Sequence, residues 1–282
     1  MLTNQNTITK NIAKIIDGRR IAERILNRLK KQPKPKKILA AVLVGRNPAS
    51  ISFLKQKEKA ADSLGIQFQL YRFSSKILEA ALKRKINQLN RDAKIGGIII
   101  QLPLPKGINR DSIIALLAKN KDVDALKGAA LVLPPAVGAL DAILKNIRFA
   151  LKGKRVVVIG RGLLVGKPIA IWLKNKVNRL DIFYSTFFDR QILEQADLII
   201  SGVGVSGLVK GSQIKKGAVL VDFGYSFKRG PTRTKRGLTQ KIAGDFDFES
   251  CAKKAKYITP VPGGTGPILV AKLLDNFYRL TK

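Results

Sequence analysis

Histidine is absent from this 282-residue chain, and cysteine, methionine and tryptophan occur once each. Without imidazole the chain lacks the commonest general base and metal ligand, and every serine or cysteine triad that depends on histidine is excluded. The single cysteine, Cys251, excludes an internal disulfide and any multi-cysteine metal site, so we expect no metal. Proton transfer must therefore use lysine, carboxylates, tyrosine, the thiol or water.

Long apolar runs are also missing. No run reaches the ~18 residues that a membrane span needs, and residues 1–20 lack the apolar block of a signal peptide. We therefore expect a cytoplasmic protein with no membrane partner. A hydrophobic content of 45%, with 24 glycines and 12 prolines spread along the chain, indicates a globular protein long enough for two domains.

Acidic residues are few, with 19 aspartates and glutamates against 53 lysines and arginines, which gives a formal net charge of +34. Such a charge attracts polyanions: nucleic acid, a phosphate-rich cofactor or an acidic small substrate. The cations are spread along the chain and not gathered on one predicted helix, so a lineage-wide bias in composition explains them equally well. Nonspecific nucleic-acid binding is compatible with this charge, and a nucleic-acid-binding protein is one alternative function.

Apolar strands alternate with amphipathic helices along the chain, which predicts an α/β fold with parallel sheets. In the first half the predicted strands and helices cover residues 38–44, 48–64, 66–71, 77–89 and 97–101. In the second half strand-like runs cover residues 156–159, 179–184, 197–201 and 218–222. Four such runs are what a doubly wound sheet requires. The unpatterned residues 1–14 are expected to form a loose terminus.

A glycine-rich turn lies in the second half. The β-branched run Val156–Ile159 leads into Gly160, Gly162 and Gly166, and an apolar helical pattern begins near Pro168. This order predicts a strand, a tight turn and a helix, an arrangement whose free N–H groups and helix dipole favour a phosphate. The spacing is one residue longer than the usual dinucleotide fingerprint, and an ordinary strand-to-helix turn remains the alternative.

The end of the following strand carries no acidic residue of the kind that holds the ribose of NAD. Tyr184, Ser185 and Thr186 stand there instead, and Arg161 and Lys167 lie in the glycine turn. These side chains suit a 2′-phosphate, so the pattern predicts NADP as the cofactor.

Three polar residues of the first half could take part in chemistry. Lys57 lies in the apolar stripe of its helix with Phe53 and Leu64. Such a lysine either snorkels to solvent or, in a poorly solvated cleft, has its pKa lowered toward neutrality and serves as a general acid and base. Gln101 ends a buried strand before two prolines, where it either satisfies a loop N–H or reaches a ligand. Asp124 is either a surface charge or an acceptor for a heterocycle.

Six motifs, taken in order, resemble one family. They are Asn-Pro-Ala-Ser-x-x-Phe-Leu-x-x-Lys at 47–57, Gly-Ile-Ile-Ile-Gln-Leu-Pro-Leu-Pro at 97–105, Lys-Asp-Val-Asp at 121–124, the glycine turn at 160–168, Ile-Lys-Lys-Gly-Ala-Val-Leu-Val-Asp-Phe-Gly at 214–224 and Thr-Pro-Val-Pro-Gly-Gly-Thr-Gly-Pro at 259–267. From about Ile16 to its C-terminus the chain resembles the bifunctional methylenetetrahydrofolate dehydrogenase/methenyltetrahydrofolate cyclohydrolase family.

This resemblance implies a homodimer of two-domain subunits. Residues 1–144 would form an α/β catalytic domain that binds tetrahydrofolate derivatives, with the C-terminal helix 268–282 packing back on it. Residues 145–267 would form a Rossmann-like domain for NADP, with an interdomain cleft between the two. The implied reactions are oxidation of 5,10-methylenetetrahydrofolate with NADP to the methenyl compound and hydrolysis of that product to 10-formyltetrahydrofolate. A monofunctional member of the same family is the nearer alternative.

The resemblance also implies the site residues. The catalytic positions are Lys57, Gln101 and Asp124. The further substrate-binding positions are Phe53, Ile100, Leu102, Pro262, Gly263, Gly264, Thr265 and Gly266. The cofactor-binding positions are Gly160, Arg161, Gly162, Val165, Gly166, Ser185 and Tyr225. Several positions depart from the family pattern: Phe53 replaces a tyrosine, Ala125 a glycine and Gly162 a serine. The segment before the linker helix is shortened to Leu-Pro-Pro-Ala at 133–136, and Thr186 and Phe187 stand where the family often has a basic residue and a threonine.

Overall fold

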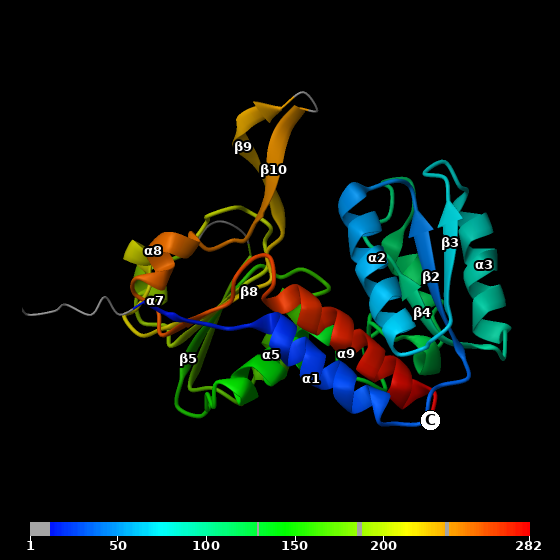
Figure 1. Ribbon diagram of the computed structural model, residues 1–282, viewed down its shortest axis with the longest axis horizontal. Helices are drawn as coiled ribbons and strands as arrows, with labels where there is room; N and C mark the ends of the chain where they lie inside the picture. The colour runs from blue at the N-terminus through cyan, green and yellow to red at the C-terminus, as the bar shows by residue number, and fades with distance from the viewer. Residues whose placement is uncertain (1–11, 129, 185–187, 235–236) are drawn as a thin grey trace, which may run out of the picture. The chain divides into compact units, whose positions relative to one another are not determined.

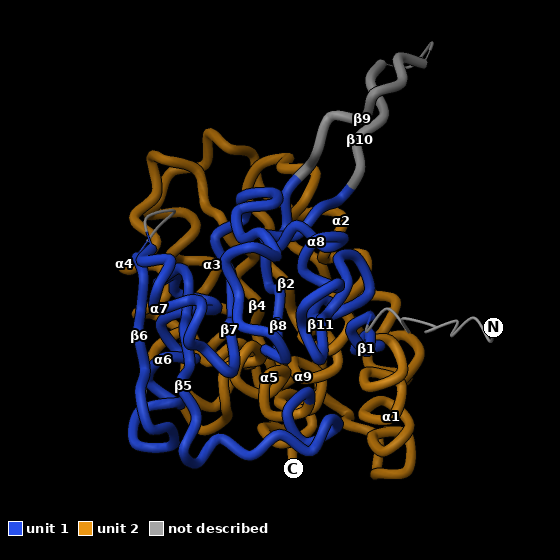
Figure 2. The backbone as a smooth tube through the Cα atoms, turned by 90° about the vertical axis from the view of Figure 1, so that its left-hand side faces the viewer, with its two compact units in different colours: residues 1–18, 143–266 blue, residues 19–142, 267–282 orange. Residues whose placement is uncertain are grey.

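The computed structural model describes residues 12–282 except 129, 185–187 and 235–236, and for residues 227–241 it describes the backbone alone. The chain forms two compact units, distinguished by colour in Figure 2. Unit 1 contains residues 1–18 and 143–266, and unit 2 contains residues 19–142 and 267–282. None of the helices in the described part of the chain has the length and apolar character that a membrane span requires.

Unit 2 is built on a three-stranded parallel sheet. The central strand, β2 (Ile38–Val44), pairs with β3 (Phe68–Phe73) on one side and β4 (Ile95–Ile100) on the other. Residues 39–44 are all buried, as an unbroken apolar run in the middle of a sheet should be. The three predicted strands are confirmed, with ends that shift by one or two residues.

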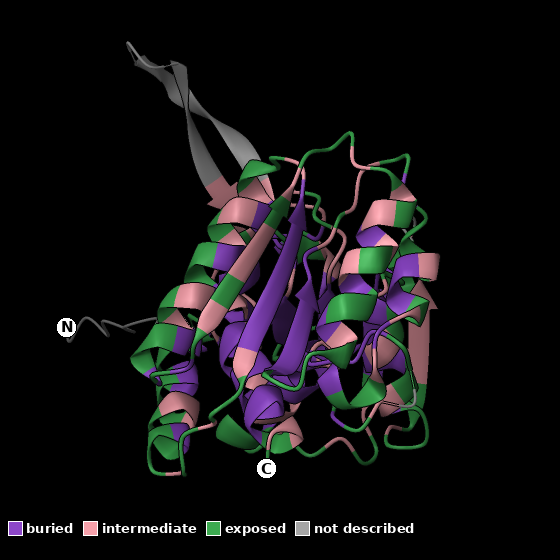
Figure 3. Ribbon diagram, turned by 90° about the vertical axis from the view of Figure 1, so that its right-hand side faces the viewer, coloured by how far each residue is buried: buried purple, intermediate pink, exposed green. Residues whose placement is uncertain are grey.

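Helices cover both faces of this sheet. They are α1 (Gly18–Lys30), α2 (Pro48–Ser63), α3 (Glu79–Arg91), α4 (Arg110–Ala115), the 3-10 helix η1 (Lys119–Lys121), α5 (Pro135–Asn146) and α9 (Thr265–Leu280). Figure 1 shows α2 and α3 on opposite sides of the sheet. The C-terminal helix α9 contributes Phe277 to a core cluster that also holds Leu39 and Ile99, so the end of the chain packs on the first sheet. Figure 3 shows the buried strands between these helices.

Unit 1 contains a six-stranded sheet in the order β1-β11-β8-β7-β5-β6, and every neighbouring pair is parallel. The strands are β1 (Lys14–Ile15), β5 (Arg155–Ile159), β6 (Arg179–Phe183), β7 (Leu198–Ser201), β8 (Val219–Asp222) and β11 (Tyr257–Ile258). The helices are α6 (Gly166–Leu173), α7 (Arg190–Leu193), η2 (Gly211–Gln213) and α8 (Phe248–Ala252). The four strands predicted for the second half are confirmed as β5 to β8.

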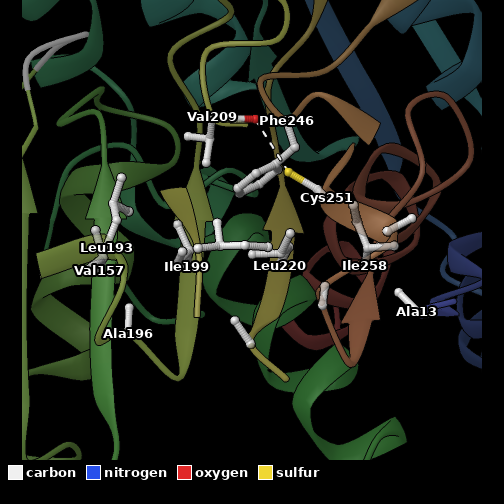
Figure 4. Packing of buried hydrophobic residues seen from close by; sticks show 14 of the residues in the cluster. Ala13, Val157, Leu193, Ala196, Ile199, Val209, Leu220, Phe246, Cys251 and Ile258 are labelled. Atoms are coloured by element: carbon white, nitrogen blue, oxygen red, sulfur yellow. Dashed lines mark hydrogen bonds between the residues drawn. The ribbon is translucent and has the colours of Figure 1, made fainter. Parts of the chain in front are cut away.

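The core of unit 1 joins neighbouring strands of this sheet. Val157, Ile199, Leu220 and Ile258 lie side by side in one buried cluster, drawn in Figure 4. Cys251 completes the cluster, and its Sγ contacts the carbonyl oxygen of Val209 at 3.4 Å. Burial raises the pKa of this thiol to about 12, so it remains protonated at neutral pH and serves as a packing residue.

The start of the chain differs from expectation. The described residues before position 17 are not loose: Ala13 N donates to Ala252 O at 2.7 Å, and Ile16 N donates to Ile258 O at 2.8 Å. β1 thereby becomes the edge strand beside β11, and the chain up to Gly18 belongs to unit 1. The compact unit that holds the first sheet thus begins at residue 19, whereas the predicted first domain covers residues 1–144. The sequence does not indicate this division, because a two-residue strand that pairs with residues 257–258 has no periodicity of its own.

An antiparallel hairpin follows β8 and has no counterpart in the sequence prediction. It consists of β9 (Ser226–Thr234) and β10 (Gly237–Ala243), with an irregular register between Leu238 and Gln240. Its strands carry few large apolar residues, so the alternation that predicts a half-buried strand is missing.

Candidate active site

The helix α2 places the first group of polar side chains. Its N-terminus is defined by Asn47, whose side chain accepts a hydrogen bond from Ser50 N at 3.0 Å, and by Pro48 in the first turn. The cap fixes where the helix begins, and therefore which side chains face the sheet. Phe53 and Lys57 follow one turn apart on the inner side, while Lys59 is exposed.

Lys57 is buried, with an exposed fraction of 5%. Its Nζ lies 3.4 Å from Gln101 Oε1 and 3.9 Å from Asp124 Oδ2, and 5.1 Å from the ring centroid of Phe53. Burial lowers the pKa of the Lys57 amine, and the nearby Asp124 carboxylate opposes that shift. The amine does not snorkel to solvent, so of the two readings of Lys57 the structure favours the poorly solvated one.

Gln101 is held in one orientation at the carboxyl end of β4. Its backbone N donates to Val42 O at 2.9 Å, and its Nε2 donates to Leu102 O at 2.8 Å. With Nε2 engaged in this way, Oε1 faces the lysine amine. The following Leu102–Pro103 peptide is cis. Because Nε2 is held by Leu102 O, the side-chain amide of Gln101 is a fixed acceptor for the Lys57 amine.

Ser50 is a member of this group that sequence reasoning missed. Its side chain is buried, and its Oγ donates to Leu102 O at 3.3 Å, the same carbonyl that Gln101 contacts. Ser50 stands seven residues before Lys57, which places both on one face of the helix. That spacing, within the Asn-Pro-Ala-Ser motif, was the signal that could have found it.

The two aspartates in the run from Lys121 to Asp124 have different roles. Asp122 is fully buried, and its Oδ2 accepts a hydrogen bond from Lys127 N at 3.0 Å. Among the described residues its Oδ1 has no hydrogen-bond partner, and burial raises the pKa of the carboxyl group. Asp124 alone of the two carboxylates lies beside Lys57. The two aspartates therefore cannot be exchanged: one is structural and the other faces the amine.

Ala125 has a positive φ of 54° directly after Asp124. An L residue in this region costs on the order of 1 kcal/mol relative to glycine. This geometry explains why glycine suits the position, and in this chain alanine adopts it.

Lys121 caps α3. Its Nζ donates to Leu89 O, Asn90 O and Asp92 O at 3.1, 2.7 and 2.7 Å. These carbonyls lie at the C-terminus of the helix, where unpaired C=O groups and the helix dipole favour a cation. The ammonium group has no hydrogen-bonding capacity left for a ligand, so its role is structural.

We expect Lys121→Met to lower the free energy of unfolding by about 2–4 kcal/mol, because it removes three charge-assisted hydrogen bonds and leaves their acceptors unpaired. Chemical denaturation measures this change. Lys119→Met, at an exposed position of the same short helix, is the matched control and should change stability by less than about 0.5 kcal/mol. Equal effects of the two substitutions would contradict the capping role.

The glycine turn of unit 1 has the geometry of a phosphate cradle. Gly160 directly follows β5 with a φ of 96°, and a Cβ at Gly166 would lie 1.8 Å from Gly160 O, so these two positions require glycine. A Cβ at Gly162 would meet nothing within 4 Å. The serine that the family pattern has at this position would therefore fit. Glycine in its place removes a hydroxyl group without relieving a steric clash. α6 begins at Gly166, two residues before the predicted Pro168.

Arg161 and Tyr184 form a pair beside this turn. The guanidinium lies over the tyrosine ring at 5.0 Å from its centroid, and Nη1 donates to the Tyr184 hydroxyl oxygen at 2.5 Å. Both side chains are exposed, and Arg161 contacts no carboxylate among the described residues. A pre-oriented guanidinium with free donors is well suited to a phosphate. Ser185, predicted beside them, lies outside the described residues.

Large apolar side chains are exposed at the carboxyl ends of four strands in unit 1. They are Tyr225 after β8, Val205 after β7, Leu164 after β5 and Tyr184 after β6. Their exposed fractions run from 39% to 70%. Open α/β sheets bind ligands at this edge, and apolar surface there matches the rings of a dinucleotide. We call the four loops that carry these residues, one after each of β5, β6, β7 and β8, the carboxyl edge.

The predicted substrate-side loop, residues 262–266, is attached to the same edge. Thr265 Oγ1 donates to Asp222 O at 2.7 Å and is buried. Gly263 has a φ of 100°, and a Cβ at Gly264 would lie 2.4 Å from Pro260 O. The loop therefore requires glycine at 263 and 264, and the Thr265 hydroxyl group holds the loop to β8.

The structure thus brings the predicted residues together in two groups. In unit 2, Lys57, Gln101, Asp124 and Phe53 form one cluster next to Leu102, while Ile100 is buried in β4. In unit 1 the described cofactor positions gather at the carboxyl edge. No group of three or more potential metal-ligating side chains occurs among the described residues.

These features define a class of protein. It is a two-domain α/β protein with a glycine turn after a strand of one sheet and a buried lysine, surrounded by polar side chains, beside the other sheet. Residues 16–124 match the family model of the tetrahydrofolate dehydrogenase/cyclohydrolase catalytic domain, and residues 134–282 match that of its NAD(P)-binding domain. The chain belongs to the tetrahydrofolate dehydrogenase/cyclohydrolase family, which confirms the resemblance drawn from the motifs.

Relatives that align with this chain over nearly their whole length support the same family assignment. The chain is 37% identical over 286 aligned residues to the bifunctional protein FolD of Bacillus licheniformis, covering 96% of this chain and 98% of that one. Its fold is similar to a crystal structure of the bifunctional enzyme FolD, methylenetetrahydrofolate dehydrogenase/cyclohydrolase, from Campylobacter jejuni, with a TM-score of 0.85, 34% identity and coverage of 95% and 98%. The Trypanosoma brucei enzyme, crystallised with NADP and an inhibitor, has a TM-score of 0.89, 29% identity and coverage of 96% and 97%.

Proposed function

We propose that this protein oxidises 5,10-methylenetetrahydrofolate to the methenyl compound with NADP and hydrolyses that product to 10-formyltetrahydrofolate. Family membership supports both reactions, and the full-length bifunctional relatives favour two activities over one. The observation that carries the hydrolysis is the buried Lys57 amine with Gln101 as its fixed acceptor. A protein that only bound nucleic acid would not need that arrangement.

Lys57 is the proton carrier in this proposal. Because burial lowers the pKa of its amine, a larger fraction is neutral near physiological pH and can take a proton at Nζ. Gln101 orients the amine, and Asp124 stabilises the ammonium form that results. Asp124 also remains available to the amino groups of a pterin ring. Phe53 offers a ring face for stacking, without the hydroxyl group of a tyrosine.

The carboxyl edge fits a dinucleotide. The glycine turn accepts phosphates, and Arg161 with Tyr184 suits a 2′-phosphate. NADP, when bound, supplies the hydride acceptor, and the protein supplies the alignment of the two rings. The proposal includes a cytoplasmic homodimer. The charge of +34 further favours acidic ligands, and any nucleic-acid binding would be nonspecific and salt-sensitive.

The test is an absorbance assay for the methenyl product with methylenetetrahydrofolate and each nicotinamide cofactor. We expect turnover with both cofactors to be measurable and kcat/KM to be higher with NADP, because no carboxylate ends β6 and Arg161 lies in the glycine turn. Hydrolysis is followed separately by the decay of supplied methenyl compound. Equal or better turnover with NAD would refute the cofactor choice, and oxidation without hydrolysis would identify a monofunctional dehydrogenase.

A further inference from the structure

Two buried carboxylates in unit 1 have no part in the chemistry described above. Asp222 and Asp245 have exposed fractions of 2% and 0%. No lysine or arginine side chain that the structure describes contacts either of them, and their partners are neutral N–H and O–H donors. Burying carboxyl groups without a neighbouring cation is costly, so the presence of these two in the core requires an explanation.

Asp245 binds the segment that follows β7. Its Oδ2 accepts from Ser201 Oγ at 2.7 Å and from Val203 N at 2.8 Å, and its Oδ1 accepts from Val205 N at 2.8 Å. Both oxygens are therefore engaged with the end of β7 and the loop that follows it, although Asp245 is about 40 residues away in sequence.

This loop packs against the glycine turn. Gly202 N donates to Ile159 O at 3.0 Å, and a Cβ at Gly202 would lie 2.8 Å from a methyl group of Val165. A Cβ at Gly160 would lie 3.2 Å from Gly202 O. A displacement of residues 202–205 would therefore disturb the place where the phosphates are expected.

Asp245 also contacts the segment that follows β8. A Cβ at Gly224 would lie 2.1 Å from Asp245 Oδ1, so only glycine leaves room for the carboxylate. Gly224 N donates to Asp222 Oδ1 at 2.7 Å, which holds the backbone just before Tyr225. One carboxylate thus touches two of the four loops of the carboxyl edge.

We propose that Asp245 is a positioning residue for the dinucleotide, one that sets the loops after β7 and β8 for cofactor binding without contacting the cofactor. The inference rests on the proposed function, because it assumes that a dinucleotide occupies the carboxyl edge. Both carboxylate oxygens accept backbone N–H groups, so an amide in their place would turn one acceptor into a donor facing an N–H group. The loop would then have to move.

The experiment compares Asp245→Asn with the unmodified protein in three measurements. Binding of NADPH is followed by energy transfer from Trp172, the single tryptophan of the chain, which lies in α6. The KM for NADP is taken from the oxidation assay, and hydrolysis of supplied methenyl compound is measured without cofactor. We expect the Kd for NADPH and the KM for NADP to rise by about 10-fold or more, as loss of a charged hydrogen bond implies, and hydrolysis to change by less than about 2-fold.

Two further variants complete the test. Asp247→Asn is the matched control: Asp247 caps α8 by accepting from Ser250 N at 3.4 Å, and asparagine caps equally well, so no property should change. Ser201→Ala removes one donor to Asp245 and keeps the carboxylate. If Asp245→Asn does not fold, Ser201→Ala is expected to weaken NADPH binding by about 2- to 10-fold.

Two results would overturn the inference. One is a folded Asp245→Asn protein that binds NADPH as tightly as the unmodified protein. The other is an equal loss of oxidation and hydrolysis, which would indicate a general structural role. Failure of the unmodified protein to bind NADPH at all would instead overturn the proposed function and, with it, this inference, so the two failures are distinguishable.

Discussion

Replacing Lys57 by methionine is expected to reduce hydrolysis of the methenyl compound by at least about 100-fold, the contribution typical of a general acid or base. Oxidation should survive in part, because hydride transfer requires no proton carried by Lys57. The methenyl compound should therefore accumulate during oxidation of methylenetetrahydrofolate. Stopped assays of both steps on the purified variant measure the separation. A variant that still hydrolyses the methenyl compound at nearly the original rate would show that the amine is only a packing residue.

Lys59→Met is the matched control, since Lys59 lies on the exposed side of the same helix. It should leave both activities unchanged. Lys57→Met itself should fold, because methionine retains the length of the apolar stem and removes an amine whose burial is unfavourable. Thermal unfolding of both variants verifies that lost hydrolysis is not lost structure.

Replacing Arg161 by glutamine is expected to raise the KM for NADP by about 10- to 100-fold, the effect of losing charge-assisted hydrogen bonds to a phosphate. The KM for NAD should change by less than about 3-fold, because NAD lacks the 2′-phosphate. The guanidinium is held by the Tyr184 ring and hydroxyl group, so its removal should leave the backbone of the glycine turn in place. Initial rates with both cofactors measure the change in preference.

Lys174→Gln is the control for the loss of one positive charge, because Lys174 is exposed at the far end of α6. Its effect on the KM for NADP should stay within about 2-fold and should diminish with added salt. Parallel losses with NADP and NAD in Arg161→Gln would contradict a role in reading the 2′-phosphate and would point to the pyrophosphate instead.

Local patterns predicted most of the regular structure. β2 was found from its unbroken apolar run, and the start of α2 from Asn47 and Pro48, because a cap and a proline act on their immediate neighbours. The sequence does not indicate the hairpin of β9 and β10, since it lacks an alternating apolar face. Nor does it indicate β1, because two residues are too few to show any period.

The candidate site was predictable to the extent that its residues share an element or a motif. Lys57 and Phe53 stand one turn apart on α2, and Gln101 ends a strand that the sequence identifies. The different roles of Asp122 and Asp124, one structural and one beside the lysine amine, could not be predicted. Adjacent carboxylates in one motif look alike in sequence, and only packing decides that Asp122 is fully buried while Asp124 reaches the amine.

The sequence by itself determined the fold class, the order of most strands and helices, the glycine turn and the family. Tertiary structure alone decided which polar groups meet. It joined β1 to β11, brought Lys121 to the end of α3 and placed Asp245 between two loops of the carboxyl edge. The physical reason is that periodicity and caps are set by neighbours along the chain. A hydrogen bond between residues 31 or 42 positions apart depends instead on how completed elements pack.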